Sequence, residues 1–162
     1  MHISFYCSEY LEGVADLLHE MSVHYNGSNA SSRDAVRTNL VSNILAPTSG
    51  VTLVLAIEND KAIGLAAISL LYPAPKETAQ LFMKELYVSS GHRGQGTGTA
   101  LMRWIACYAV SKNCTRFDWT VDASNEVALE FYRRLNATHV TDKLYFRFGG
   151  ERLTQFADES LV

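Results

Sequence analysis

A short glycine-rich run, Arg93-Gly94-Gln95-Gly96-Thr97-Gly98, has the clearest chemical meaning in the sequence. It stands between a strand-like pattern at residues 80–88 and a helix-like pattern whose first apolar position is Leu101. At such a junction several backbone N–H groups lack helical acceptors, and the helix dipole also favours an anion. Glycine permits close approach, while Arg93 and Thr97 add a charge and a hydroxyl. The run therefore predicts a phosphate site, although a turn with special backbone angles would need the same glycines.

Two common phosphate-binding motifs fit the run less well. A P-loop ends in G-K-[ST], whereas this run continues as Gly98-Thr99-Ala100. The dinucleotide fingerprint G-x-G-x-x-G begins at Gly96 but finds Leu101 where its third glycine belongs. Asp118 does lie about where a ribose-binding acid would fall. However, a Rossmann fold opens on a βαβ unit, and this run follows an antiparallel region, so a nucleotide-binding oxidoreductase is only a remote alternative.

A second motif follows one helix and one strand later, as Asn125-Glu126-Val127-Ala128-Leu129-Glu130-Phe131-Tyr132. The first motif, read as R-x-x-G-x-G on Arg93, Gly96 and Gly98, resembles the pyrophosphate loop of the GNAT superfamily of N-acetyltransferases. The second resembles that family's N-x-x-A-x-x-F-Y signature. The resemblance covers roughly residues 51–148 and is similar to the branch that acetylates small amines, including polyamines. It implies acetyl-CoA as cosubstrate and direct transfer of the acetyl group to a primary amine of a small molecule or peptide in a ternary complex.

The resemblance also implies roles on the donor side. The backbone of Leu86, Tyr87 and Val88 would hold the pantetheine arm and the thioester, and a backbone N–H, that of Val88, would stabilise the developing oxyanion. Asn125 would hydrogen-bond the pantetheine amides, unless it is only a solvent-facing helix residue. The residues expected to surround the pyrophosphate are Arg93, Gly94, Gln95, Gly96, Thr97, Gly98 and Thr99. The same fold could also serve a non-catalytic module that binds or senses acyl-CoA.

Two side chains are candidates for proton transfer. Tyr132 would protonate the departing thiolate, and its alternative is an aromatic residue filling the core as Phe131 does. Glu85 would accept a proton from the amine, because alkyl amines with a pKa near ~10.4 are mostly protonated at neutral pH. Its alternatives are an ion pair with Lys84 or Arg93, or a solvated edge position. Polyamine acetyltransferases tend to show two acids at the Lys84-Glu85 position, so diamine specificity is doubtful.

The acceptor side is less clearly marked. The two N-terminal helices, residues 25–31 and the proline-containing loop 72–76 would build it, with His24, Tyr25 and Tyr72 as tentative substrate-binding residues. Packing of a helix end and of loop aromatics on the core explains the same residues equally well.

The elements that must position these residues follow from the periodicity. Helical spacing marks residues 11–24 and 36–44, and strand patterns mark 51–57, 62–71, 80–88 and 116–121, with a turn at Asn59-Asp60. Helices follow at 101–112 and 128–135, with Ser124 as N-cap, and one or two last strands are expected near Val140 and at 144–148. Asn136, where the family has glycine, tolerates a left-handed cap. The fold class is α/β (α+β): a mixed sheet flanked by helices, antiparallel at first, ending in a parallel pair that is splayed in the family.

Composition sets the remaining limits. The chain has 162 residues, a length that predicts one domain, 1–162. Hydrophobic residues make up 48% and charged residues 19%, with a net charge of −3, which is the balance of a globular protein. Its parts would be acceptor-side helices (1–50), an acetyl-CoA-binding core (51–148) and a C-terminal tail (149–162). Neither nucleic acid nor a membrane is an expected partner, because no basic cluster or membrane-spanning run occurs. The cysteines and histidines are scattered through the sequence, which predicts that no metal is bound. A cytoplasmic location is expected. The resemblance to the family also implies a homodimer.

Overall fold

A five-stranded sheet organises the first of two compact units, Met1–Asp122. The computed structural model describes residues 1–158, and the second unit begins at Ala123. The strand order is the order of the sequence, β1-β2-β3-β4-β5. Their bounds are β1 His2–Phe5, β2 Thr52–Glu58, β3 Lys61–Ala74, β4 Thr78–Val88 and β5 Cys114–Trp119.

The pairing confirms the predicted mixed sheet. Strands β1 to β4 pair antiparallel with their neighbours, and β5 pairs parallel with β4. Asn59 and Asp60 turn β2 into β3 with positive φ angles of 49° and 58°. Positive φ at both central residues is what a tight hairpin turn requires, so the turn predicted at these positions is confirmed.

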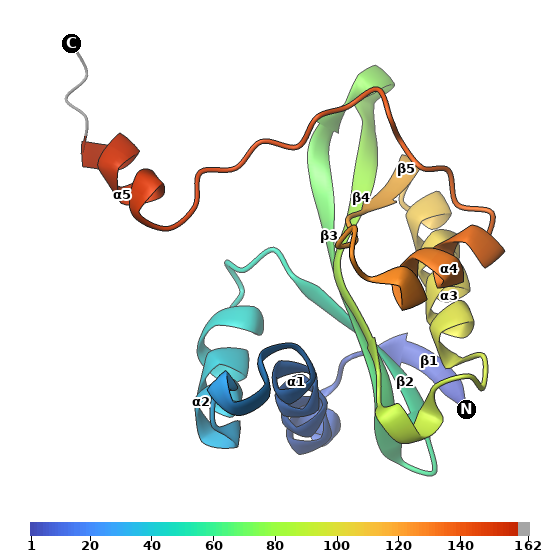
Figure 1. Ribbon diagram of the computed structural model, residues 1–162. Helices are drawn as coiled ribbons and strands as arrows, with labels where there is room; N and C mark the ends of the chain where they lie inside the picture. The colour runs from blue at the N-terminus through green and yellow to red at the C-terminus, as the bar shows by residue number, and fades with distance from the viewer. Residues whose placement is uncertain (159–162) are drawn as a thin grey trace. The chain divides into compact units, whose positions relative to one another are not determined.

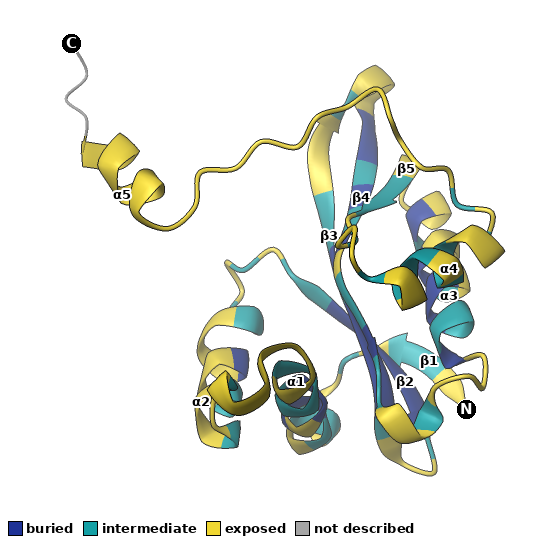
Figure 2. Ribbon diagram, viewed as in Figure 1, coloured by how far each residue is buried: buried dark blue, intermediate teal, exposed yellow. Residues whose placement is uncertain are grey.

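Helices cover both faces of the sheet (Figure 1). On one face lie α1, Leu11–Asn26, and α2, Arg33–Asn39, which continues as the π-helical turn η3, Leu40–Ile44. On the other face lies α3, Thr97–Ser111, whose Leu101 and Ile105 are fully buried. The core is darkest along the middle strands in Figure 2, where strand residues are buried from both sides. Short 3₁₀ turns complete the unit: η1 Ser8–Tyr10, η2 Gly27–Asn29, η4 Pro75–Glu77 and η5 Ser90–His92.

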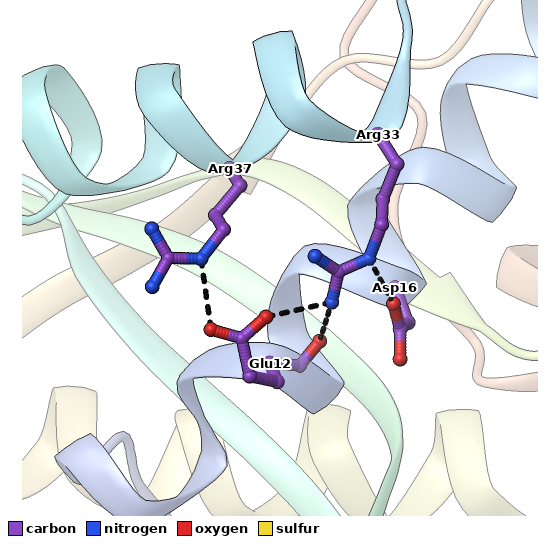
Figure 3. Close-up of polar contacts among 4 residues, drawn as sticks. All are labelled: Glu12, Asp16, Arg33 and Arg37. Carbon is purple, nitrogen blue, oxygen red and sulfur yellow. Dashed lines mark hydrogen bonds and ion pairs between the residues drawn. The ribbon is translucent and has the colours of Figure 1, made fainter.

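An ion-pair cluster fastens α2 to α1 (Figure 3). Arg33 donates to Asp16 Oδ1 at 2.7 Å and to Glu12 Oε2 at 2.8 Å, and Arg37 donates to Glu12 Oε1 at 2.8 Å. The hydrogen bonds from Arg33 and Arg37 hold the pKa of Glu12 below its ordinary value. Because one carboxylate is shared by two guanidinium groups, α2 is held in one register on α1 despite the exposure of the cluster.

The second unit contains α4, Glu126–Arg134, and α5, Glu151–Asp158. Asn125, rather than the expected Ser124, caps α4 by accepting the Ala128 N–H at 3.1 Å. The C-terminal end closes as a Schellman motif, with Asn136 N–H bonded to Arg133 O and Ala137 N–H to Tyr132 O. Asn136 has a φ of 56°, so the left-handed cap predicted for it is confirmed.

Two expectations need correction. Residues 140 and 144–148 are not strands, because no neighbouring strand within residues 1–158 forms a ladder with them. The segment around Pro73 belongs to β3, where a register shift between Leu71 and Ala74 accommodates the missing proline N–H. Within the expected C-terminal tail, residues 151–158 form α5, while 159–162 lie outside the described residues.

Candidate active site

A β-bulge separates the two halves of β4. Met83 pairs with Ile68 and Glu85 pairs with Ala67, so Lys84 is an extra residue with no partner in β3. The pairing of β4 with β5 ends at the same point, at Met83 opposite Trp119. Bulges bend strands and recur beside active sites. The bend explains why residues 84–88 continue along β3 but leave β5, which confirms the splayed parallel pair of the predicted fold.

The splay exposes a stretch of strand backbone. Along residues 84–88, the groups that point away from β3 have no ladder partner in the five-stranded sheet. Tyr87 packs into the core cluster beneath α1, and Glu85 shares its face because it lies two residues away. Leu86 and Val88 face the opposite side, where Val88 and Leu101 of α3 both approach Gly64. The predicted donor-side strand therefore combines an open backbone edge with an acidic side chain on the α1 face.

The glycine run forms the turn between β4 and α3. Gly94 and Gly96 have φ angles of 74° and 86°, and a Cβ at either position would meet nothing within 4 Å. These two glycines are thus required for their left-handed backbone rather than to relieve crowding within the chain. Gly96 is the N-cap of α3, and the first helical bond runs from Ala100 N–H to Gly96 O.

The start of α3 presents the donors expected of an anion site. The N–H groups of Thr97, Gly98 and Thr99 precede the first helical bond and therefore have no acceptor within the helix. Gln95 Nε2 donates to Gly91 O at 3.1 Å, which ties the run back on itself. The Thr97 side chain is buried, whereas Gln95 is exposed. A preformed left-handed turn at a helix N-terminus fits a pyrophosphate.

Arg93 faces the strand as well as the loop. Its Nε donates to the carbonyl of Val88 at 2.9 Å, and its guanidinium carbon lies 5.2 Å from the centre of the Tyr87 ring. The Arg93 side chain therefore links the start of the glycine run to the end of β4. The carbonyl oxygen of Val88 accepts this hydrogen bond from Arg93. The backbone N–H of Val88 is therefore the group of this residue that could donate to an oxyanion.

Glu20 of α1 is a residue that the sequence interpretation missed. Its Oε1 accepts the N–H of Ser90 at 2.8 Å, and its carboxylate also interacts with Ser89 and with the Tyr87 hydroxyl. Burial acts to raise the pKa of Glu20, but these hydrogen bonds outweigh it and the pKa is lowered. Conversely, burial and the Glu20 carboxylate raise the pKa of Tyr87, against a smaller opposing effect of Arg93. No sequence signal marks Glu20, because it is one acid among several on an amphipathic helix.

Glu85 forms an ion pair with Lys84, which was the alternative to a role in proton transfer. Lys84 Nζ lies 2.7 Å from Glu85 Oε1, and the side chains are 74% and 33% exposed, respectively. The pair is local to the bulge, and the more exposed lysine is the easier partner to displace. A role for Glu85 in proton transfer stays a prediction.

The tentative acceptor residues lie in two places. His24, near the end of α1, contacts the Tyr25 ring at 5.1 Å and lies 6.3 Å from the Tyr87 ring. Tyr72 is 67% exposed on β3, beyond the last regular pair of the hairpin. A pocket of about 280 Å³ between α1 and α2 is lined by other residues, among them Leu18, Met21, Val36 and Asn39. The structure thus brings His24 and Tyr25 to the Tyr87 side of β4, while Tyr72 lies toward the tip of the hairpin.

The remaining predicted residues lie on α4 in the second unit. The Asn125 side chain oxygen caps the helix, which gives this residue a structural role besides the expected one. Tyr132 is half-buried, and its ring lies 5.1 Å from that of Phe131. Their roles toward a cosubstrate stay predictions.

Comparisons with known proteins match the part of the chain that contains these residues. The sequence model of the acetyltransferase (GNAT) family matches residues 15–137, which include the glycine run and α4. The chain is 34% identical over 80 residues to thialysine N-epsilon-acetyltransferase of Mus musculus, covering 48% of this chain and 47% of that protein. It is 29% identical over 91 residues to L-2,4-diaminobutyric acid acetyltransferase of Shouchella clausii, covering 56% and 49%. The matched region is thus about half the length of these curated relatives.

Solved structures share the fold. An integron cassette protein from the mobile metagenome of V. cholerae is 34% identical, with a TM-score of 0.93 over 98% of both chains. An aminoglycoside acetyltransferase from an uncultured soil metagenomic sample, solved with sisomicin, has a TM-score of 0.73 at 17% identity. It covers 91% of this chain and 95% of its own, and at that identity the likeness is one of fold. None of the helices in residues 1–158 is long and apolar enough to cross a membrane.

Proposed function

Because the chain belongs to the GNAT family of acetyltransferases, we propose that it transfers the acetyl group of acetyl-CoA to a primary amine. The observation that carries the proposal is the departure of β4 from β5 at Lys84, directly before the left-handed glycine run. An open strand edge and an anion-binding turn then follow each other along one stretch of chain. Acetyl-CoA has a peptide-like arm and a pyrophosphate in the same succession.

The residues of the first unit fit this cosubstrate. The backbone groups of Leu86 and Val88 that point away from β3 would bond the pantetheine arm as a neighbouring strand would, while Tyr87 between them pairs with Leu65 of β3. The N–H groups from Gly96 to Thr99, with Arg93, would bind the pyrophosphate. In the second unit, Asn125 is proposed to donate its amide Nδ2 to the pantetheine arm, since its Oδ1 caps α4. Acetyl-CoA supplies the activated acetyl group when bound.

The proposed reaction is direct attack in a ternary complex. Glu85 accepts one proton from the ammonium form of the acceptor, and the freed nitrogen attacks the acetyl carbon. The Val88 N–H donates to the carbonyl oxygen as negative charge develops there. The carbon–sulfur bond then breaks, Tyr132 gives its proton to the sulfur, and the nitrogen loses its second proton, which restores the tyrosine through solvent. The products are an amide, CoA as thiol and one proton released from Glu85.

The acceptor we propose is a small amine. Thialysine and 2,4-diaminobutyric acid, named in the curated relatives, are both amino acids with a second amine on a short side chain. Glu85 lies on the face of β4 that α1 covers, and His24 and Tyr25 lie on the same side near Tyr87. We propose that these residues and Tyr72 contact the acceptor. The homodimer and the cytoplasmic location expected from the sequence stay predictions.

The test is a mass-spectrometric screen of the purified chain with acetyl-CoA and a panel of amines. The panel holds thialysine, 2,4-diaminobutyric acid, lysine, a polyamine, an aminoglycoside and a peptide with a free N-terminus. We expect a gain of one acetyl group on a small diamino acid, with equal release of free CoA. Thermal stabilisation by acetyl-CoA without turnover of any amine would instead indicate a binding or sensing module. Stabilisation by NAD(H) but not by CoA would overturn the proposal.

A further inference from the structure

Three polar side chains form a cluster on the last two strands of the sheet. Gln80 of β4 donates its Nε2 to Asp118 Oδ2 at 2.7 Å. Arg116 of β5 pairs with the same Asp118 oxygen through Nε at 3.1 Å, and its Nη2 donates to Gln80 Oε1. All three residues lie in the unit Met1–Asp122, and the proposed reaction uses none of them. Asp118 is also the acid whose spacing from the glycine run resembles that of a dinucleotide site.

The register of the sheet puts this cluster on the same face as Glu85. Glu85 pairs with Ala67 of β3, and Ala67 shares a face with Ser69, two residues further along the strand. Phe82 pairs with that Ser69 on one side and with Asp118 of β5 on the other. Glu85, Phe82 and Asp118 therefore follow one another across a single face of the sheet.

The spacing of the two acidic positions follows from the strands. Glu85 and Phe82 are offset by two residues of β3, or roughly 7 Å, and Asp118 lies one strand, or roughly 5 Å, to the side. Glu85 and Asp118 are therefore roughly 8 Å apart on this face. In extended lysine the two nitrogens are separated by six single bonds, or roughly 7–8 Å, and in 2,4-diaminobutyric acid by four bonds, or roughly 5 Å. The spacing fits the longer molecule.

The cluster keeps groups with which to bind an amino acid. Within residues 1–158, Asp118 Oδ1 takes no hydrogen bond, because both partners of this side chain use Oδ2. Arg116 uses Nε and Nη2, which leaves its Nη1 without a bond in the same part of the chain. A carboxylate oxygen accepts from an ammonium, and guanidinium N–H groups donate to a carboxylate. The pair is complementary to both charges of an amino-acid head group.

Phe82 gives the space between the two acidic positions an apolar floor. It is half-buried, so part of its ring is open to contact with methylene groups. The side chains of Arg116 and Asp118 are 48% and 40% exposed, which leaves them accessible to a ligand. An acid, an aromatic ring and an ion pair thus occur in the order of a side-chain amine, its methylene groups and an amino-acid head group.

We propose that Arg116 binds the α-carboxylate of the acceptor and Asp118 its α-ammonium, while the distal amine lies at Glu85. Gln80 is a positioning residue, because it holds both charged side chains by hydrogen bonds. This assignment rests on the proposed acetyl transfer, and it specifies the acceptor as a diamino acid of about the length of lysine. A site for a polyamine would have no use for Arg116, because a polyamine carries no carboxylate.

Two acceptors that differ in one group test the assignment. Lysine and 1,5-diaminopentane have the same amine spacing, but only lysine has a carboxylate. From initial rates at saturating acetyl-CoA, we expect kcat/KM to be at least about tenfold higher for lysine, because charged hydrogen bonds are lost with the carboxylate. 2,4-Diaminobutyric acid should be poorer than lysine, since its amines do not span both positions.

The outcomes separate this assignment from the proposed function. Equal efficiency with lysine and 1,5-diaminopentane would overturn the head-group site and leave the acetyl transfer standing. A higher efficiency with 2,4-diaminobutyric acid than with lysine would overturn the length. If no amine is acetylated, the proposed function is wrong and the assignment falls with it.

Single substitutions in the cluster test the two charges separately. Arg116→Gln should lower kcat/KM for lysine by about tenfold and leave that for 1,5-diaminopentane undiminished, which also reports that the variant is folded. Asp118→Asn should lower both values, because both acceptors carry a second ammonium. Arg103→Gln, at an exposed arginine of α3, is the matched control and should change neither.

Equal losses toward both acceptors in Arg116→Gln would mean that the cluster only stabilises the pairing of β4 with β5. Unchanged kinetics in Asp118→Asn would mean that the second ammonium lies elsewhere. Either result overturns the assignment.

Discussion

The Glu20 carboxylate accepts the backbone N–H of Ser90 at 2.8 Å, which joins residues 70 positions apart in the sequence. Glu20 belongs to α1, on the side proposed for the acceptor, and Ser90 begins the turn that leads to the glycine run. Tyr87, between them, also interacts with Glu20 and lies under the Arg93 guanidinium. One carboxylate thus holds α1, the end of β4 and the proposed phosphate turn in a fixed arrangement.

Replacing Glu20 should weaken acetyl-CoA binding more than it slows the reaction. Glu20→Ala leaves the Ser90 N–H without its acceptor, and we expect KM for acetyl-CoA to rise by up to about tenfold, because a hydrogen bond to a charged group is worth ~1.5–3 kcal/mol before solvent screening. Initial-rate kinetics with acetyl-CoA varied measure the change. Glu20→Gln keeps an acceptor and should recover part of it, while Glu58→Ala, at an exposed acid, is the control. A fall in kcat with unchanged KM would contradict this positioning role.

The same carboxylate predicts a pH dependence of stability. The pKa of Glu20 is lowered in the folded chain, so its ionised form is favoured by folding. This contribution is present above the ordinary value of 4.5 and is lost as the pH falls through the lower folded value. Melting temperatures of the natural chain and Glu20→Gln should therefore differ by a constant amount at neutral pH and converge in acid below 4.5. A difference that widens on acidification would contradict the assignment.

The paired residues Lys84 and Glu85 allow the two interpretations of Glu85 to be separated. If Glu85 accepts the proton of the amine, Glu85→Gln should lower kcat by about a hundredfold. Lys84→Gln removes the ion pair but keeps the carboxylate, so it should retain most of the activity. Initial rates of both variants at saturating acetyl-CoA measure the two losses. Equal losses in the two variants would indicate that only the ion pair matters.

The fold could be predicted largely because its elements are locally encoded. The switch from helical to alternating spacing at Val51, the Asn59-Asp60 turn and the glycine run each correspond to a boundary in the structure. Residues 144–148 show the limit of this reasoning. Their composition favours a strand, but a strand exists only with a neighbour, and the sequence does not state which surface supplies one.

The candidate site was predictable only where a motif names its residues. The left-handed φ angles of Gly94 and Gly96 fit the phosphate-binding turn that the sequence motif predicts. In contrast, the bulge at Lys84 depends on the relative register of β3 and β4, which periodicity does not reveal. Glu20 depends on how α1 lies against β4, and Asn125 acquires a capping bond that its motif role does not require. Side chains that act across distant segments need the tertiary structure.

Tyr132→Phe tests the proposed proton donor. The substitution keeps the ring that packs beside Phe131 and removes only the hydroxyl. We expect kcat to fall by about a hundredfold with little change in KM for acetyl-CoA, because the proton is needed only as the thiolate departs. Tyr108→Phe, on α3 where the ring stacks on Trp104, is the control and should keep its rate. If the release of CoA by Tyr132→Phe matches that of the control, Tyr132 fills space only.

Gly96 and Gly91 form a matched pair for the phosphate turn. A Cβ would meet no atom within 4 Å at either position, but only Gly96 has a left-handed φ, of 86°. Gly96→Ala must therefore either bear ~1–2 kcal/mol of backbone strain or rotate the N–H groups at the start of α3 away from the pyrophosphate. We expect a lower melting temperature and clearly weaker acetyl-CoA binding by calorimetry, whereas Gly91→Ala should match the natural chain in both. Equal weakening in the two variants would mean that the turn responds to added bulk, and not to its left-handed backbone.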